Sequence, residues 1–280
     1  MRHSSFSELP GPIGIFDSGY GGLTILSRIR KLLPDYDFMY LGDNARTPYG
    51  TRSFEVVYEF TSQCVEKLFD KGCHLVILAC NTASAKALKS IQVNDIPQLD
   101  SNRRVLGIIR PTVESIGSIT KTRHVGILAT PGTIKSMSYP MEIRKLFPDI
   151  KVTGEACPIW VPLVETGEFA SDGTDFFIGK HVRNLLSKDS LIDTIILGCT
   201  HYPLLIDKIR KFVPEGINII SQGDYVAASL QDYLARHPEI DEKCTRGGEC
   251  RYLTTESVEQ FLPSASLFLN EPIKAETVII

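Results

Sequence analysis

The sequence predicts an α/β fold with two similar parallel-sheet domains that are related by internal duplication. Short apolar runs rich in β-branched residues alternate along the chain with amphipathic stretches of helical length. One run, residues 75–79, contains no polar side chain, which is typical of a parallel strand covered by helices on both faces. Two segments of the first half also recur in the second half, which indicates two copies of one α/β unit.

Several segments have the length and composition of buried strands: residues 13–16, 38–41, 75–79, 105–109, 125–128, 152–156 and 194–197. Stretches that fit amphipathic helices lie between them: residues 22–33, 54–70, 81–91, 133–146 and 174–186. Because strands joined by a crossover helix run parallel, this order predicts parallel sheets.

The duplication rests on two pairs of segments. Residues 13–19 and 125–131 both read apolar-Gly-apolar-apolar and then enter a small polar turn, at an offset of 112 positions. A second pair of strands ends in Cys80 and Cys199, which are offset by 119 positions and are each followed by polar residues. Chance similarity between buried strands is the alternative, and the shared cysteine argues against it. We therefore expect one domain from residues 1–107 with 222–280 and another from residues 108–221.

Ligands of open parallel sheets bind beyond the carboxyl ends of the strands. Side chains able to do chemistry follow such strand ends in both copies: Asp17, Asp43, Cys80, Thr130 and Cys199. We therefore expect the active site in a cleft between the two domains.

Composition and charge argue against several classes of protein. The 280 residues include 30 basic and 33 acidic side chains, with a net charge of −3 and no long run of like charges, so no nucleic-acid partner is expected. No apolar run approaches the ~18 residues of a membrane span, and residues 1–11 are polar rather than signal-like. We expect a cytoplasmic protein with no membrane partner and, because the leader before residue 13 is short, no regulatory N-terminal extension.

The seven cysteines are expected to be thiols, because the cytoplasm is reducing and their number is odd. Cys244 and Cys250 have no paired His or Cys at zinc spacing, so no metal site is expected.

Two polar loops are candidates for binding. Residues 17–23 hold three glycines before an expected helix, whose first amides favour an anion, although the segment matches neither a P-loop nor a dinucleotide-binding loop. A plain strand–helix turn capped by Asp17 or Ser18 is the alternative. In the loop after residues 38–41, Asp43 is suited to orienting a base or receiving an ammonium group, or else to closing its own turn.

Cys80 and Cys199 are the strongest candidates for chemistry. Each follows a strand at the expected start of a helix, where the amide dipoles favour a thiolate. His201 is suited to moving a proton to or from Cys199 or to steering a carboxylate. Hydroxyl and amide donors adjoin the two cysteines: Asn81, Thr82 and Thr200. Inert packing is the alternative, and two matched positions argue against it.

Two thiols across a cleft suit the inversion of an α-carbon. A thiolate on one face removes the proton while a thiol on the other face supplies one, and no cofactor is needed. Donors around the substrate carboxylate would stabilise the carbanion. Residues 157–165, with two prolines and Trp160, are expected to form a stiff apolar lining that brings Glu165 near the second thiol, the alternative being a packed loop.

Taken together, these segments resemble the glutamate racemase family, within the aspartate/glutamate racemases. The resemblance runs from residue 13 to about 205 and is carried by Asp17-Ser18-Gly19-x-Gly21-Gly22-Leu23, Tyr40-x-Gly42-Asp43-x-Ala45-Arg46-x-Pro48-Tyr49-Gly50, Cys80-Asn81-Thr82-Ala83-Ser84, Cys157-Pro158 with Val164-Glu165, and Gly198-Cys199-Thr200-His201-Tyr202-Pro203.

The resemblance implies interconversion of L- and D-glutamate without a cofactor, supply of D-glutamate for peptidoglycan, and a homodimer. It implies that Cys199 deprotonates L-glutamate and that Cys80 deprotonates the D-isomer. The supporting acids and histidine fall on Asp17, Asp43, Glu165 and His201. Substrate contacts fall on Asp17, Ser18, Tyr49, Gly50, Asn81, Thr82, Thr200 and His201.

Two positions depart from the family's pattern. Asn44 stands where Thr is common, and the strand at residues 105–109 continues as Arg110-Pro111-Thr112 where many members have Glu-Pro-Gly. We expect the second departure to affect regulation or domain contacts more than chemistry.

Three other interpretations stay open: an aspartate or hydantoin racemase, a non-catalytic amino-acid-binding protein, and a cysteine phosphatase or hydrolase. Cys80 lacks the Arg in its following turn that the third would need.

Overall fold

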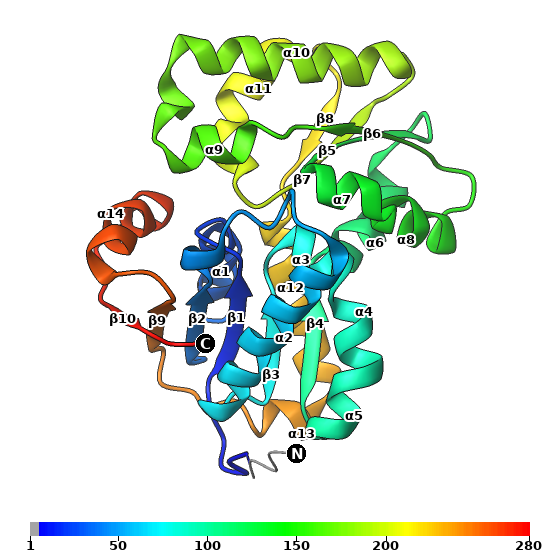
Figure 1. Ribbon diagram of the computed structural model, residues 1–280. Coiled ribbons are helices and arrows are strands. Elements are labelled where there is room, and N and C mark those ends of the chain that lie inside the picture. Colours follow the sequence, from blue (N-terminus) through cyan, green and yellow to red (C-terminus); the bar gives the residue numbers. More distant parts are fainter. Residues whose placement is uncertain (1–5) are drawn as a thin grey trace.

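The computed structural model describes residues 6–280 and contains two sheets whose strands are all parallel (Figure 1). The larger sheet has the order β10-β9-β2-β1-β3-β4, and the smaller has the order β6-β5-β7-β8. Residues 1–5, part of the expected first domain, lie outside the described residues. The strands are β1 (Ile13–Asp17), β2 (Phe38–Gly42), β3 (Leu75–Leu78), β4 (Arg104–Gly107), β5 (His124–Ala129), β6 (Lys151–Ala156), β7 (Thr194–Gly198), β8 (Asn218–Ile220), β9 (Cys250–Thr254) and β10 (Ala275–Thr277).

The two sheets share one strand order. The run β2-β1-β3-β4 in the larger sheet corresponds to β6-β5-β7-β8 in the smaller, with β1 matched to β5 and β3 to β7. These are the pairs of segments whose similarity predicted a duplication. The larger sheet differs by adding β9 and β10 from the C-terminal part of the chain. The predicted α/β class with two parallel sheets is confirmed.

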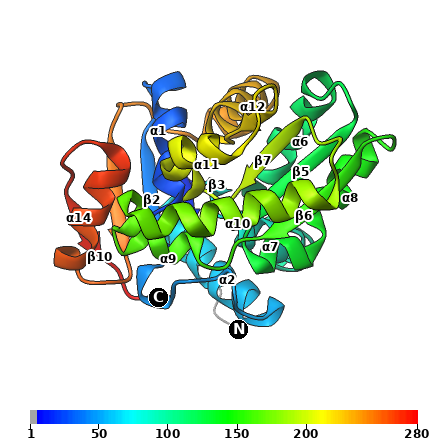
Figure 2. The ribbon, with the colours of Figure 1, turned by 90° about the horizontal axis from the view of Figure 1, so that it is seen from above.

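Helices cover both faces of the larger sheet. Ile13 and Ile15 pack on one face, under the neighbouring helices α1 and α12, whereas Phe16 packs on the opposite face with α2 and α3 (Figure 2). Both faces of β1 are therefore apolar, as a central parallel strand requires. The bounds of these helices are α1 (Gly22–Leu32), α2 (Phe54–Asp70), α3 (Asn81–Lys86) and α12 (Gly223–Arg236).

The smaller sheet is covered in the same way. The long helix α10 lies at the top of Figure 1 and crosses the middle of Figure 2, and it packs with α11 on one face, through Ile178 and Ile209. Val113 and Ile143 from α6 and α8 belong to the apolar cluster on the other face. The bounds are α6 (Ile109–Ile119), α8 (Ser138–Leu146), α10 (Asp172–Lys188) and α11 (Ile206–Phe212).

The prediction of a strand at residues 105–109 is wrong at its end. β4 stops at Gly107 and Ile109 begins α6, so Arg110-Pro111-Thr112 is helical rather than extended. Pro111 lies in the first turn of α6, where the amides have no partner within the helix and a missing N–H is tolerated. This helix carries the chain from the larger sheet to the smaller one.

The prediction of one helix at residues 133–146 is also wrong. The structure has α7 (Pro131–Ser136) and α8, separated by Met137 in the left-handed conformation with φ of 57°. Pro140 explains the break. In one continuous helix its nitrogen would face the Ser136 carbonyl without a hydrogen to donate, and its ring would clash there.

The remaining elements were predicted in part or not at all. The expected helix 81–91 continues as short segments to residue 99, with a π-helical turn η2. β8 and β10 are three-residue strands with exposed positions, so they lack the apolar run of a buried strand. The other elements are η1 (Asn44–Arg46), α4 (Leu88–Ser90), η2 (Ile91–Asp95), α5 (Ile96–Leu99), α9 (Trp160–Glu165), η3 (Glu168–Ala170), η4 (Tyr202–Leu205), α13 (Pro238–Asp241) and α14 (Val258–Leu269).

A search of residues 6–280 for a helix both long enough and apolar enough to cross a bilayer finds none.

Candidate active site

A cavity lies beyond the carboxyl ends of the central strands of both sheets. Cys80 follows β3 of the larger sheet and Cys199 follows β7 of the smaller, and both line this cavity. Chain segments 119 positions apart therefore meet at one site. The lining residues are Ser18, Thr47, Pro48, Tyr49, Gly50, Thr51, Cys80, Asn81, Thr82, Thr130, Pro131, Pro158, Val161, Pro162, Cys199, Thr200 and His201.

The Cys80 thiol is held by donors and acceptors of the larger-sheet half. Cys80 is the N-cap of α3, and its sulfur accepts a hydrogen bond from the Ala83 amide at 3.4 Å. Its S–H donates to Ser18 Oγ, also at 3.4 Å. Burial raises the pKa of Cys80 to about 12, with help from the charge of Asp17 and against the two hydrogen bonds. Cys80 is therefore a neutral thiol at neutral pH.

Asp17 lies behind this thiol rather than in the cavity wall. Its side chain is fully buried at the end of β1, and Oδ2 accepts from the Gly19 amide at 2.9 Å. Oδ1 has no hydrogen-bond partner among the described residues. Burial raises the pKa of Asp17, while His201 and the amides of Gly22 and Gly19 oppose that rise. Asp17 thus acts on the cavity through its charge.

The Cys199 thiol has a different partner. Its sulfur lies 3.8 Å from His201 Nδ1, and His201 Nε2 lies 2.9 Å from Glu165 Oε1. Burial alone would lower the pKa of His201, but the hydrogen bonds with Cys199 and Glu165 and their charges raise it to about 10. His201 is therefore a buried imidazolium at neutral pH, placed between a thiol and a carboxylate.

The prediction of a helix start at both cysteines holds for Cys80 alone. After Cys199 the chain forms the short 3₁₀ helix η4, with Pro203 in its first turn, and α11 begins only at Ile206. Cys199 therefore lacks the helix start expected there. Its polar neighbour is His201 instead.

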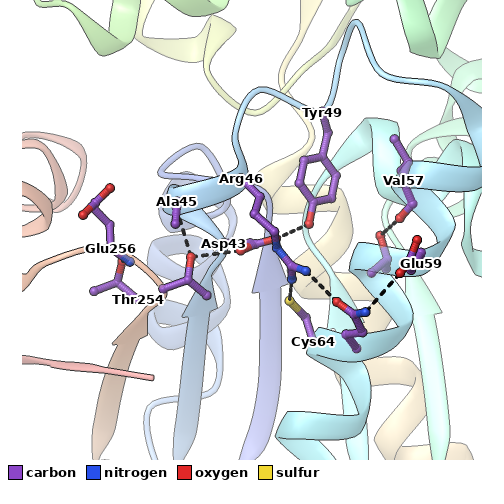
Figure 3. A network of polar contacts seen from close by, with 12 residues as sticks. Asp43, Ala45, Arg46, Tyr49, Val57, Glu59, Cys64, Thr254 and Glu256 are labelled. Atoms are coloured by element: carbon purple, nitrogen blue, oxygen red, sulfur yellow. Dashed lines mark hydrogen bonds and ion pairs between the residues drawn. The ribbon is translucent and has the colours of Figure 1, made fainter. Parts of the chain in front are cut away.

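Asp43 lies outside the cavity wall, in the polar network of Figure 3. Its Oδ2 accepts from Arg46 Nε at 2.7 Å and from the Tyr49 hydroxyl, and its Oδ1 accepts from Thr255 Oγ1 at 2.9 Å. Both oxygens accept hydrogen bonds from the protein, and Asp43 is not among the residues that line the cavity. Tyr49 does line the cavity, and Asp43 holds its hydroxyl in place.

Other predicted residues reach the cavity wall directly: Ser18, Tyr49, Gly50, Asn81, Thr82, Thr200 and His201. Glu165 contacts the cavity only through His201. The expected apolar lining from residues 157–165 is confirmed by Pro158, Val161 and Pro162, although part of the segment is the helix α9 rather than a loop.

Thr130 was expected at a strand end but was not among the predicted catalytic residues or substrate contacts. It lines the cavity, and its hydroxyl lies 3.0 Å from that of Thr82 and 3.1 Å from that of Thr133. The duplication carried the signal, because Thr130 follows β5 where Ser18 follows β1.

Glycines allow the two halves to approach each other. A Cβ on Gly21 would lie 2.5 Å from His201 Nδ1 and closer still to Thr200 Oγ1. The N-cap of α1 is Gly21 and no side chain caps it, so Asp17 and Ser18 do not serve as caps. Gly21 thus serves close packing against the second cysteine loop, whereas Gly22 packs against Asp17 and Ala79 of its own half.

No group of three or more His, Cys, Asp and Glu side chains in the described part of the chain is arranged to hold a metal ion.

Comparison with known proteins shows which family the sequence matches. A sequence model of the Asp/Glu/Hydantoin racemase family matches residues 23–230. A glutamate racemase from Ruegeria sp. (strain TM1040) is 39% identical over 274 residues, which cover 94% of this chain and 98% of the relative.

Solved structures agree over nearly the whole chain. A glutamate racemase isoform from Bacillus anthracis is 34% identical with a TM-score of 0.87, covering 96% of this chain and 98% of that one. A glutamate racemase from Francisella tularensis, in complex with D-glutamate, is 31% identical with a TM-score of 0.85, covering 96% and 97%. With matching sequence and fold, this chain belongs to the Asp/Glu/hydantoin racemase family.

Proposed function

We propose that this protein is a cofactor-independent glutamate racemase that interconverts L- and D-glutamate by two-thiol proton transfer. One observation carries the proposal: Cys80 and Cys199, from the two halves of a duplicated chain, line the same cavity. Inversion of an α-carbon needs one proton acceptor and one proton donor on opposite faces. The glutamate racemases that resemble this chain support glutamate as the substrate.

The protonation state of Cys80 suits it to donate a proton in the free protein. Cys80 carries its proton at neutral pH, because its pKa is raised to about 12, so it is ready to donate. Cys199 lies 3.8 Å from His201 Nδ1, a ring nitrogen placed to exchange a proton with its sulfur. We propose that Cys199 removes the α-proton of L-glutamate while Cys80 supplies a proton from the other face. The D-isomer uses the reverse roles.

The supporting residues act behind the two thiols. His201 and Glu165 form a hydrogen-bonded pair beside Cys199 that can relay its proton. Asp17 raises the pKa of Cys80 and so keeps the donor protonated. Asp43 is a positioning residue that holds Tyr49 in the cavity wall.

We assign the substrate contacts to wall residues with donors. Hydroxyl and amide groups of the wall would bind the two carboxylates and stabilise the carbanion. These residues are Ser18, Tyr49, Gly50, Asn81, Thr82, Thr200 and His201, with Asp17 acting from behind.

The proposal also covers the domain division, the oligomeric state, the cellular location and the metabolic role of the protein. We propose domains at residues 1–107 with 222–280 and at 108–221, a division that leaves each sheet within one domain. A homodimer, a cytoplasmic location and supply of D-glutamate for peptidoglycan are proposed from the resemblance to glutamate racemases.

The test is proton NMR of L-glutamate with the protein in D2O, without added cofactor, together with a chiral assay. We expect the α-proton signal to disappear while D-glutamate accumulates. A persistent α-proton at high protein concentration would contradict glutamate racemisation. Aspartate and a hydantoin, measured alongside, distinguish the related racemases by kcat/KM. A tightly bound amino acid without α-proton exchange would support a binding protein instead.

A further inference from the structure

A buried amide, Gln222, joins the two crossovers of the chain between the sheets. Gln222 is only 2% exposed and is the N-cap of α12, where the chain returns from the smaller sheet. Its Nε2 donates to the carbonyl of Ile108, at 3.2 Å, where the chain leaves the larger sheet. It also lies 3.2 Å from Thr112 Oγ1 of α6. One side chain therefore ties together both connections between the halves.

The Ile108 carbonyl sets the direction of a chain of hydrogen bonds. A carbonyl can only accept, so the nitrogen of Gln222 must face it, and Oε1 must face Asn81. Oε1 then accepts from Asn81 Nδ2 at 2.5 Å, which turns Asn81 Oδ1 toward Tyr139. Tyr139 OH donates to that oxygen at 2.8 Å and accepts from Gln222 Nε2 at 2.9 Å. The amide of Asn81 is held at both ends.

This network reaches both cysteines. Asn81 follows Cys80 directly and lines the cavity. The Tyr139 ring packs beside Gly198, the residue before Cys199, where a Cβ on the glycine would meet Tyr139 Cε2 at 3.3 Å. Tyr139 is 1% exposed and burial raises its pKa, so its hydroxyl keeps its proton. The Gln222–Asn81–Tyr139 network thus spans the two halves of the site from behind.

We propose that Gln222 is a positioning residue for racemisation, acting through Asn81 and Tyr139 to hold the two cysteine loops in register. Proton transfer on both faces of one carbon requires both thiols at reaction distance, so a small change between the halves slows it. Buried amide networks of this kind are stable only when every member is satisfied. The inference rests on the proposed racemase activity.

The test compares Gln222→Met, which keeps the side-chain length but makes no hydrogen bonds, with Tyr139→Phe, which removes one oxygen. The control is Gln92→Met, because Gln92 likewise donates to a backbone carbonyl, that of Val105 in β4 at 2.7 Å, but lies outside the cavity wall. We expect kcat/KM for glutamate to fall at least about tenfold in Gln222→Met and about threefold or more in Tyr139→Phe, consistent with the loss of buried hydrogen bonds. Gln92→Met should stay within about twofold of the wild type.

A double-mutant cycle separates positioning from general destabilisation. Each variant is combined with Asn81→Ala and assayed well below its Tm, which is measured for every protein. If Gln222 acts through Asn81, Gln222→Met should lower kcat/KM by less than about twofold in that background. The full loss in both backgrounds would overturn the proposal, as would wild-type kcat/KM in the single variants. If Gln222→Met does not fold, the result for Tyr139→Phe alone decides.

A wild-type protein without racemase activity would overturn the proposed function and this role together. Unaffected variants of an active protein would overturn only this role.

Discussion

The two halves of the site occupy equivalent positions in the duplicated sheets and yet surround their thiols with different chemistry. Cys80 caps the helix α3 and donates to the neutral hydroxyl of Ser18. Cys199 precedes a 3₁₀ helix and lies beside His201, which is paired with Glu165. The thiols lie at equivalent strand ends of the two sheets, and the side chains around them differ.

The acid that influences Cys80 has no counterpart in the other half. Asp17 ends β1, whereas Ala129 ends β5 at the matching position. Asp17 raises the pKa of Cys80, and a buried thiolate beside a carboxylate is unfavourable. The comparison teaches that equivalent positions in the two halves carry different charged neighbours, Asp17 near Cys80 and His201 with Glu165 near Cys199.

The largest expected effect comes from replacing either thiol. Cys80→Ser and Cys199→Ser should each lower kcat/KM by roughly 10²–10⁴-fold, because a hydroxyl is a much weaker acid than a thiol. The loss should be equal for L- and D-glutamate, since enantiomers have equal free energies in water. Steady-state racemisation in both directions measures this.

The control for the thiol variants is Cys244→Ser. Cys244 is a buried thiol outside the cavity that donates to the carbonyl of Ile240, a bond that serine can also make. Its activity should match the wild type. Full activity in either active-site variant would break the two-thiol comparison.

The next largest loss of activity should come from replacing Gly21, where the two halves are in close contact. In Gly21→Ala the new methyl group would push against Thr200 and His201, and a displacement of that kind lowers activity by roughly 10²-fold. Overpacking should also destabilise the fold by about 1–3 kcal/mol. Kinetics and thermal unfolding measure both.

Gly173→Ala is the matched glycine control. It lies in α10, where a methyl group would meet only Ser171 Oγ at 3.8 Å. This variant should keep its activity and gain about 0.4–1 kcal/mol of stability. Equal activities of the two variants would contradict the tight fit at Gly21.

Removing the charge of Glu165 should have a smaller and pH-dependent effect. Glu165 helps raise the pKa of His201 to about 10, so Glu165→Gln should lower that pKa. We expect kcat/KM to fall roughly tenfold, as for loss of a hydrogen bond to a charged group. The alkaline limb of the pH profile should move to lower pH, which kcat/KM measured across the alkaline range tests.

The pair of His201 and Glu165 also predicts how the free energy of unfolding changes with pH. The pKa of His201 is raised on folding, so its stabilisation is complete below the unfolded value and is lost as pH rises through about 10. Glu165→Gln should flatten the decline in the free energy of unfolding over that range. Glu168→Gln, at an exposed acid of η3, is the control for both measurements. An unmoved alkaline limb would contradict the role of Glu165.

The smallest expected effect on kcat/KM comes from removing the hydroxyl that follows β1, Ser18, or the one that follows β5, Thr130. The two should differ in how they couple to the nearby cysteine. Ser18→Ala removes the acceptor of the Cys80 thiol and should lower kcat/KM by roughly 2–10-fold. In the Cys80→Ser background it should cause little further loss, because the two groups act together. Thr130→Val combined with Cys199→Ser should be additive, since Thr130 bonds Thr82 rather than a sulfur. Equal coupling in both pairs would mean that the halves are equivalent.

Local pattern predicted much of the fold and the centre of the site. The apolar run at residues 75–79 and the repeated Cys-polar step were sufficient to expect parallel sheets and two thiols at matched strand ends. The errors in helix boundaries lie near prolines: Ile109 begins a helix, with Pro111 in its first turn, where the end of a strand was expected, and Pro140 divides one helix into two. Short edge strands such as β10 lack an apolar run and gave no signal.

What the sequence determined by itself is the class of fold, the equivalence of its two halves and the two cysteines, because burial of parallel strands and duplication both leave periodic traces along the chain. Only the tertiary structure decided that burial raises the pKa of Cys80, that Asp43 holds the Tyr49 hydroxyl, and that Gln222 ties the crossovers to Asn81. These properties depend on hydrogen bonds and charges between residues far apart in the chain, and such contacts leave no local pattern.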